Sequence, residues 1–212
     1  MGRPAPDYTV YLVTDAAQCA GRGVVATARL AVAGGARVVQ LREKTLGTRA
    51  FVALAREVLA ALEGSGALVL VNDRVDVALA AGAHGVHVGQ GDMHPDDARR
   101  LLGPQAVIGL SVETPAQAEA ARGLDVDYYG VSPVFATPTK TDTGPAWGLE
   151  GLARLRAATA RPLVAIGGIG PANAADVLRA GADGLAVVSA ICRASDPRRA
   201  AADLRAAADA AR

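Results

Sequence analysis

The segment AGAHGVHVG (81–89) joins a helix-ending glycine to a short apolar run, and relatives of it recur along the chain. GGARVVQLR (34–42) and AGADGLAVVSA (180–190) share the whole pattern, and VDYYGVSPV (126–134) resembles its second half. Glycine just past a helix end allows the left-handed turn that leads into the next strand. The recurrence predicts a fold assembled from repeated helix–strand units.

Eight such apolar runs alternate with turns and alanine-rich helical stretches. They are YLVTD (11–15), VVQLR (38–42), LVLVND (68–73), GVHVG (85–89), VIGLSV (107–112), YYGVSPV (128–134), LVAIGGI (163–169) and GLAVVSAI (184–191). Several are almost continuously apolar, which is typical of parallel strands buried on both faces. Eight β and α units predict an α/β protein of one domain (1–212), a (β/α)8 TIM barrel. An open doubly wound sheet is the alternative, although it usually has fewer strands.

Composition limits the classes of function. A chain of 212 residues fits one domain, and 51% hydrophobic but only 3% aromatic residues predict a core of Ala, Val, Leu and Ile. The net charge is +1 and the charged residues are scattered, so we expect neither nucleic-acid nor membrane partners. Cys19 and Cys192 fit no metal-ligand spacing and are interpreted as free thiols. With no apolar signal core and no run near ~18 apolar residues, we expect a soluble, cytoplasmic protein.

Two segments predict a phosphate site. The seventh run ends in IGGIG (166–170) and the eighth contains VVSAI (187–191). In phosphate-binding barrels, backbone N–H groups at these two places hold the phosphate, and glycine lets the backbone come close. The alternative is a pair of ordinary tight turns. We favour the phosphate site because both segments are present.

The second run ends in QLREK (40–44), which carries two cations. Alternation along a strand places Gln40, Arg42 and Lys44 on one face. If this face points into the barrel, the two cations converge at its mouth, where an anion would compensate them. The alternative is that both side chains extend into solvent.

Acidic residues follow the third and fourth runs. Asn72 and Asp73 end the third, and Asp92 follows the fourth. Mg²⁺ commonly takes one or two carboxylates together with water and phosphate oxygens, so Asp73 and Asp92 are candidate ligands. Helix capping by Asp73 is the alternative, and Asp15 is a rival ligand.

Other polar residues near the strand ends are less specific. Ser111 follows no nucleophile-elbow pattern and is interpreted as a hydrogen-bonding residue. His87 alternates with valines, so we expect it to pack inside the barrel, and no histidine has zinc-site spacing. The loop VFATPTKTDTG (134–144) contains Lys140, one of only two lysines beside 20 arginines. Its connection, 135–148, is long for a barrel turn and could close over a ligand.

With QLREK, VND, HVGQGD, GLSVET, ATPTKTDTG, IGGI and VVSAI in this order, the sequence resembles the thiamine phosphate synthase family over nearly its whole length. The resemblance implies a Mg²⁺-dependent transferase of thiamine biosynthesis. Such an enzyme joins an aminopyrimidine methyl diphosphate to a thiazole phosphate, or to the carboxylated form, and releases pyrophosphate. Its partners would be small molecules, and the sequence leaves a homo-oligomer open.

The resemblance also implies roles for single residues. Those implied to hold the pyrimidine diphosphate are Gln40, Leu41, Arg42, Glu43, Lys44, Asn72, Ser111 and Lys140, of which Arg42, Lys44, Ser111 and Lys140 are implied to be catalytic. Those implied to hold the thiazole phosphate are Thr137, Pro138, Thr139, Gly168, Val188 and Ser189. Asp73 and Asp92 are implied to hold Mg²⁺.

Three rival functions remain open. A thiazole tautomerase would need an acid or base near the thiazole and no diphosphate site. A sugar-phosphate isomerase or epimerase would share the glycine and VVSAI segments but would leave QLREK unexplained. A non-catalytic metabolite-binding protein would use the same residues.

Overall fold

The structure of the protein, a computed structural model, describes residues 6–137 and 144–211. Eight strands form its centre. They are β1 (Val10–Val13), β2 (Val38–Leu41), β3 (Leu68–Asn72), β4 (Gly85–Val88), β5 (Val107–Val112), β6 (Tyr128–Val131), β7 (Leu163–Ile166) and β8 (Gly184–Val187). Each strand pairs in parallel with the next, and β8 pairs with β1, so the sheet closes into a barrel. The prediction of a (β/α)8 barrel is confirmed.

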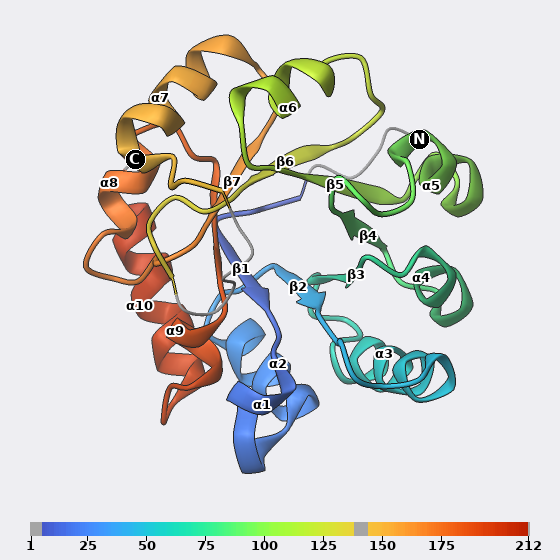
Figure 1. The fold of residues 1–212 in the computed structure, drawn as a ribbon. Coiled ribbons are helices and arrows are strands. Elements are labelled where there is room, and N and C mark those ends of the chain that lie inside the picture. The colour runs from blue at the N-terminus through green and yellow to red at the C-terminus, as the bar shows by residue number, and fades with distance from the viewer. Residues whose placement is uncertain (1–5, 138–143, 212) are drawn as a thin grey trace.

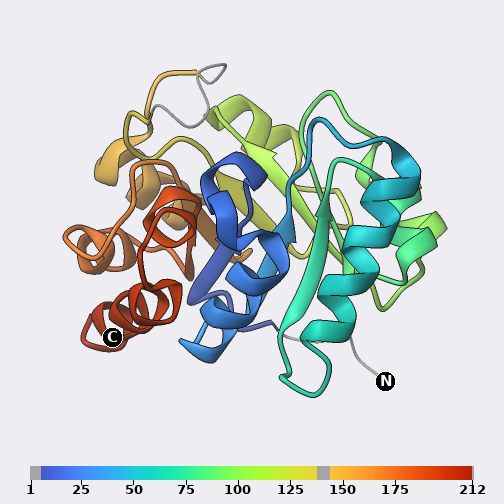
Figure 2. The same ribbon diagram turned by 90° about the horizontal axis from the view of Figure 1, so that it is seen from below.

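Helices surround the barrel (Figures 1 and 2). They are α1 (Ala16–Cys19), the 3-10 turn η1 (Ala20–Arg22), α2 (Val24–Ala33), α3 (Thr48–Ala61), α4 (Val75–Ala81), α5 (Pro95–Leu102), α6 (Pro115–Ala120), α7 (Gly148–Ala158), α8 (Ala174–Arg179), α9 (Ser189–Cys192) and α10 (Pro197–Asp209). Among residues 6–137 and 144–211, no helix combines the length and the apolar character needed to cross a membrane.

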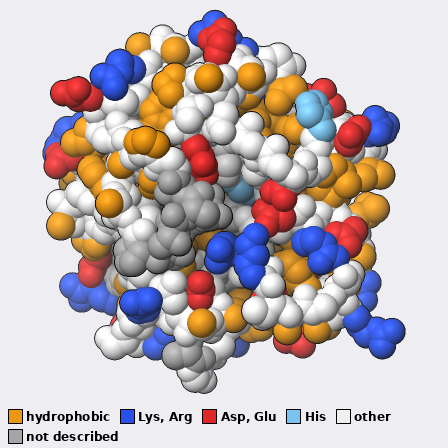
Figure 3. All heavy atoms as spheres, in the orientation of Figure 1, with side chains coloured by type: hydrophobic (Ala, Val, Ile, Leu, Met, Phe, Trp, Pro, Cys, Tyr) orange, Lys and Arg blue, Asp and Glu red, His pale blue; other side chains and the backbone are white. Residues whose placement is uncertain are grey.

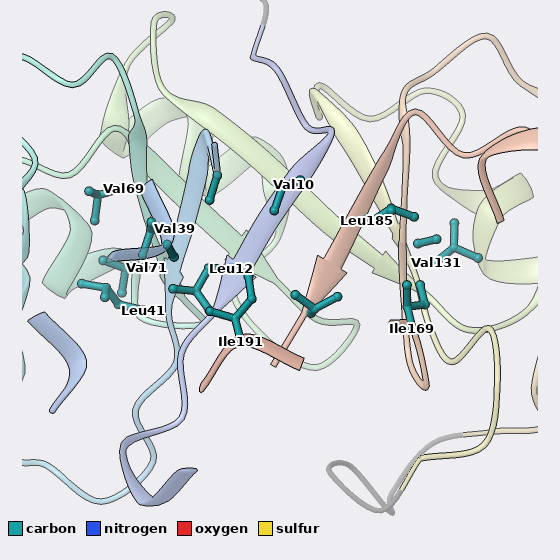
Figure 4. Packing of buried hydrophobic residues seen from close by; sticks show 14 of the residues in the cluster. Val10, Leu12, Val39, Leu41, Val69, Val71, Val131, Ile169, Leu185 and Ile191 are labelled. Atoms are coloured by element: carbon teal, nitrogen blue, oxygen red, sulfur yellow. The ribbon is translucent and has the colours of Figure 1, made fainter. Parts of the chain in front are cut away.

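The larger core lies between the barrel and the helices. Strand side chains that point away from the barrel axis, including Leu12, Val39, Leu41 and Val71, are fully buried there (Figure 4). Phe51 of α3 joins the same cluster. This layer contains mostly aliphatic side chains, as the composition predicts, and β-branched valines suit the strands that form it.

The smaller core fills the inside of the barrel, and it is more aromatic than the composition suggested. Tyr8, Tyr11 and Tyr128 are buried together there, with the Tyr8 and Tyr128 ring centroids 4.8 Å apart. The expectation of a purely aliphatic core is therefore wrong for the interior. Three of the seven aromatic residues lie here, where a large ring can span the space between opposite strands.

Glycine makes room for these interior rings. A Cβ atom at Gly109 of β5 would overlap the Tyr128 ring, and one at Gly130 of β6 would lie 2.7 Å from Cε1 of His87. Neither position could hold a Cβ atom unless the neighbouring ring moved. Inside the barrel, the large rings of Tyr128 and His87 therefore lie against glycines, which have no side chain.

Candidate active site

A cavity of about 640 Å³ lies over one end of the barrel, lined mainly by residues at or just after the carboxyl ends of the strands, with its floor formed by residues inside the barrel. Eleven residues expected from the sequence line it. They are Gln40, Arg42, Lys44, Asn72, Asp73, Asp92, Ser111, Thr137, Gly168, Val188 and Ser189. Barrel enzymes place their active sites at this end. Three other expected residues, Pro138, Thr139 and Lys140, lie outside the described part of the chain.

The end of β2 follows the expected alternation. Gln40, Arg42 and Lys44 line the cavity. Leu41 instead packs in the outer core, and the Glu43 carboxylate accepts a hydrogen bond from the Thr45 backbone N–H at 2.7 Å. The side chains of Leu41 and Glu43 are therefore not in the cavity, and only their backbone could contact a substrate there.

The two cations keep acidic neighbours but are not deeply buried. Lys44 Nζ lies 2.6 Å from Asp73 Oδ2, and its side chain is 55% exposed. Arg42 Nη1 lies 3.7 Å from Asp15 Oδ2. Asp15 also accepts a hydrogen bond from the backbone N–H of Gln18 at 3.0 Å, at the start of α1, and does not line the cavity. Asp15, the alternative candidate for a Mg²⁺ ligand, is therefore engaged in other contacts.

Asp73 does not cap the following helix. Helix α4 begins at Val75 after Arg74, without a side-chain cap. Asp73 has a left-handed backbone (φ 64°), a conformation that aspartate tolerates better than most residues. Its N–H donates to the His87 carbonyl at 2.8 Å, which ties the end of β3 to β4. The capping alternative is not realised, because this carboxylate is directed to Lys44.

Asp92 lies beside Asp73 although the two residues follow different strands. The Asp92 carboxylate accepts a hydrogen bond from the Gly89 N–H at 2.7 Å. Partial burial raises the pKa of the Asp92 carboxyl, and the neighbouring Asp73 carboxylate raises that pKa further. Acidic and basic side chains lie side by side near the centre of the face seen in Figure 3. Two converging carboxylates with a repulsive interaction form a site that favours a cation.

The opposite side of the cavity is formed by glycine-rich backbone. After β7, Gly167 and Gly168 have positive φ angles of 108° and 65°. The Asn173 side chain fixes this loop, because its amide donates to the Gly168 carbonyl and its oxygen accepts from Gly170 N–H, both at 2.9 Å. A Cβ atom at Gly168 would also lie 2.9 Å from Cβ of Phe135. Glycine is therefore needed for backbone conformation and for packing against the β6 loop.

Several cavity residues were not expected as site residues from the sequence. Tyr11, His87 and Tyr128 line the floor, and Asn173 lines the glycine side. His87 lies inside the barrel as expected, but its hydrogen bond to Ser111, 2.8 Å from Nε2 to Oγ, was not anticipated. The sequence could have indicated this hydrogen bond only through the positions of Ser111 and His87 on neighbouring strands. Those positions become informative only once the register of β4 and β5 is known.

Comparisons with known proteins agree over almost the whole chain. The family model described as thiamine monophosphate synthase matches residues 10–191. The thiamine-phosphate synthase of Albidiferax ferrireducens is 57% identical over 196 residues, which cover 92% of this chain and 90% of the relative. That of Xanthobacter autotrophicus is 55% identical over 210 residues, which cover 99% of this chain and all of the relative.

Solved structures give the same result. The thiamine phosphate pyrophosphorylase of Pyrococcus furiosus superposes with a TM-score of 0.88 at 36% identity, covering 97% of this chain and 98% of that one. A 3-hexulose-6-phosphate synthase, 21% identical with a TM-score of 0.64, covers 94% of this chain and 99% of that one and shares the fold alone. This chain belongs to the thiamine monophosphate synthase family.

Proposed function

We propose that this protein is a thiamine-phosphate synthase. It joins an aminopyrimidine methyl diphosphate to a thiazole phosphate and produces thiamine phosphate and pyrophosphate; with the carboxylated thiazole phosphate, CO2 is released as well. The observation that carries the proposal is the division of one cavity into two unlike halves. Cations and carboxylates from β2, β3 and β4 face glycine-rich backbone and a serine from β7 and β8. Each half suits a different phosphorylated substrate.

The carboxylate pair fits Mg²⁺ on chemical grounds. Asp73 and Asp92 offer only oxygen atoms, and the raised pKa of Asp92 reflects burial and repulsion, the second of which a cation would relieve. Mg²⁺ prefers one or two carboxylates and completes its coordination with water and substrate phosphate oxygens. When bound, it would supply positive charge to the diphosphate. Asp73 and Asp92 are the residues that would hold it.

Arg42, Lys44 and Ser111 would act on the diphosphate half. The reaction breaks the bond between the pyrimidine methylene carbon and the diphosphate oxygen, so negative charge grows on the departing oxygen. The Arg42 guanidinium and the Lys44 ammonium are fixed charges that stabilise this growth, and Ser111 supplies a hydrogen bond. The pyrimidine amino group delocalises the positive charge left on the methylene carbon.

The glycine half would hold the thiazole phosphate so that the ring nitrogen faces that carbon. Backbone N–H groups near Gly168 and Ser189, with the Thr137 hydroxyl, are the donors we assign to this phosphate. Attack by the neutral nitrogen needs orientation and no base. Among the cavity residues described from Thr137 onward, none carries an acidic or basic side chain, which disfavours a thiazole tautomerase.

The decisive experiment mixes the purified protein with both substrates and Mg²⁺ and follows pyrophosphate and thiamine phosphate together. We expect equal amounts of the two products, and no pyrophosphate when either substrate is omitted. Conversion of the thiazole phosphate to an isomer in the absence of the pyrimidine would instead support the tautomerase.

A pair of arginine variants tests the assignment of the diphosphate half. Arg42→Met should lower kcat about 100-fold, as expected for loss of one preorganised donor. Arg74→Met removes the same charge from an exposed arginine that contacts Asp76 and Thr48 outside the cavity. This control should keep near-normal activity. Similar losses in both variants would show that Arg42 acts only through general charge or folding.

A further inference from the structure

An unbroken chain of four hydrogen bonds crosses the interior of the barrel. Gln40 Nε2 lies 2.7 Å from Tyr11 Oη, which lies 2.8 Å from Tyr128 Oη. Tyr128 Oη lies 2.8 Å from His87 Nδ1, and His87 Nε2 lies 2.8 Å from Ser111 Oγ. The chain therefore connects β2 to β5 through β1, β6 and β4. It begins at Gln40, which the family resemblance implies to hold the pyrimidine diphosphate, and ends at Ser111, which the proposed function places against that diphosphate.

The members of this chain are withdrawn from water. Tyr11 and Tyr128 are 1% and 0% exposed, and Gln40 and His87 are 5% and 9% exposed. Burial raises the pKa of both phenols, so each keeps its single proton at neutral pH. Each hydroxyl therefore has a single proton, so it can donate at most one of its two hydrogen bonds in this chain and accepts the other.

Counting these protons gives the chain a direction. An amide nitrogen can only donate, so Tyr11 accepts from Gln40, and within this chain Tyr128 is the neighbour that can accept the Tyr11 proton. Tyr128 has then accepted one bond and donates to His87 Nδ1. A histidine that accepts at Nδ1 carries its proton on Nε2 in the neutral form, so it donates to Ser111.

We propose that this chain is a one-way relay in which Gln40, Tyr11, Tyr128 and His87 position the Ser111 hydroxyl as a hydrogen-bond donor to the cavity. Because Ser111 Oγ accepts from His87, its own proton is turned to the ligand. The proposal rests on the proposed function, in which that ligand group is the diphosphate. It makes His87 and Tyr128 positioning residues that act through Ser111.

The packing of the barrel holds the relay in place. The imidazole lies against Gly130, whose missing Cβ would otherwise lie 2.7 Å from Cε1 of the ring. The His87 and Tyr128 rings are tilted by 31° with centroids 5.5 Å apart. The imidazole is therefore packed between the Gly130 backbone and the Tyr128 ring.

The test reads the tautomer of His87 directly, by ¹⁵N NMR of the ring nitrogens at neutral pH without substrate. His87→Asn identifies the signals by their disappearance. We expect the wild type to carry the proton on Nε2 alone, with Nδ1 as an acceptor. A proton on Nδ1, or an even mixture of both tautomers, would overturn the relay.

Neighbouring tyrosines on opposite faces of β6 supply a matched pair of variants. Tyr128→Phe removes the proton given to Nδ1, so both tautomers should become populated. Tyr129→Phe removes a buried hydroxyl that bonds to the Ala121 carbonyl outside the relay, so the wild-type tautomer should remain. An unchanged tautomer in Tyr128→Phe would contradict the proposed direction.

Kinetics then ask whether the relay acts through Ser111. Tyr128→Phe should lower kcat about tenfold and leave affinity for the thiazole phosphate unchanged. In a Ser111→Ala background the same change should have almost no further effect, because the residues act as one unit. If the decreases in kcat from Tyr128→Phe and Ser111→Ala are fully additive, Ser111 is not part of the relay. The tautomer is measured without substrate, so failure of the proposed function would leave that result intact.

Discussion

At the scale of single residues, the charges around Asp73 and Asp92 explain how two carboxylates can lie close together. Lys44 compensates Asp73, but Asp92 carries a carboxyl whose pKa is raised by partial burial and by Asp73. A raised folded-state pKa means that the folded protein binds a proton more readily than the unfolded chain. The contribution of Asp92 to the free energy of unfolding is therefore present at low pH, and it is lost as the pH rises through the pKa of Asp92 in the folded protein. A divalent cation would have the opposite pH dependence, because it competes with that proton.

Binding of Mg²⁺ to this acidic pair should change the thermal stability of the protein. Mg²⁺ should raise the Tm of the wild type, and by more under neutral to alkaline than under acidic conditions, because a proton bound by the Asp92 carboxyl, whose pKa is raised, competes with the metal. Asp92→Asn should remove the like charge, keep or slightly raise the Tm without metal, and abolish the increase with Mg²⁺. Differential scanning calorimetry gives both values.

Asp97→Asn is the matched control, because Asp97 pairs with Arg100 on α5. It should keep the wild-type response to Mg²⁺. An undiminished Mg²⁺ effect in Asp92→Asn would move the metal to other ligands, with Asp15 the next to examine.

At the scale of elements, the sequence predicted all eight strands, but it placed the end of every strand except β5 too late. The run GLAVVSAI continued as apolar residues to 191, whereas β8 ends at Val187 and α9 begins at Ser189. Hydrophobicity is the same on both sides of this boundary, so periodicity carried no signal for it. The alternation of QLREK was predictable, because it depends only on neighbouring residues in one strand.

The β7 loop gives a second prediction, in which neighbouring glycines differ. Gly168→Ala should lower the free energy of unfolding by about 1–2 kcal/mol, because φ is positive and the new Cβ would collide with Phe135. It should also weaken thiazole phosphate binding by displacing the loop. Gly170→Ala meets no atom within 4 Å and should be tolerated. Urea unfolding and calorimetric titration of each variant measure the two effects.

Equal losses in the free energy of unfolding for Gly168→Ala and Gly170→Ala would show that loop entropy, and not the close approach to Phe135, is the reason for glycine at position 168. Retained thiazole phosphate affinity in Gly168→Ala would separate this loop from the phosphate. Both results can be obtained without the pyrimidine substrate.

At the scale of the whole molecule, the barrel was predictable because eight similar units leave few alternative architectures. The polar interior was not. Tyr11 and Tyr128 are 117 residues apart, and their contact exists only after β1 and β6 have been placed across a closed barrel. No local pattern distinguishes an inward tyrosine at 128 from the outward one at 129. Barrel closure therefore determines which polar residues reach the cavity floor.

The packing inside the closed barrel can be tested at Gly109, where a side chain would overlap the Tyr128 ring. Gly109→Ala should lower the free energy of unfolding by about 1–3 kcal/mol through overpacking, measured by urea unfolding. Gly123→Ala meets no atom within 4 Å and is the matched control. Combining Gly109→Ala with Tyr128→Leu should cost less than the sum of the single changes, because the smaller side chain releases the space that the methyl group needs. Strict additivity would mean that the strands move apart to admit the methyl group, and that the interior rings do not set the width of the barrel.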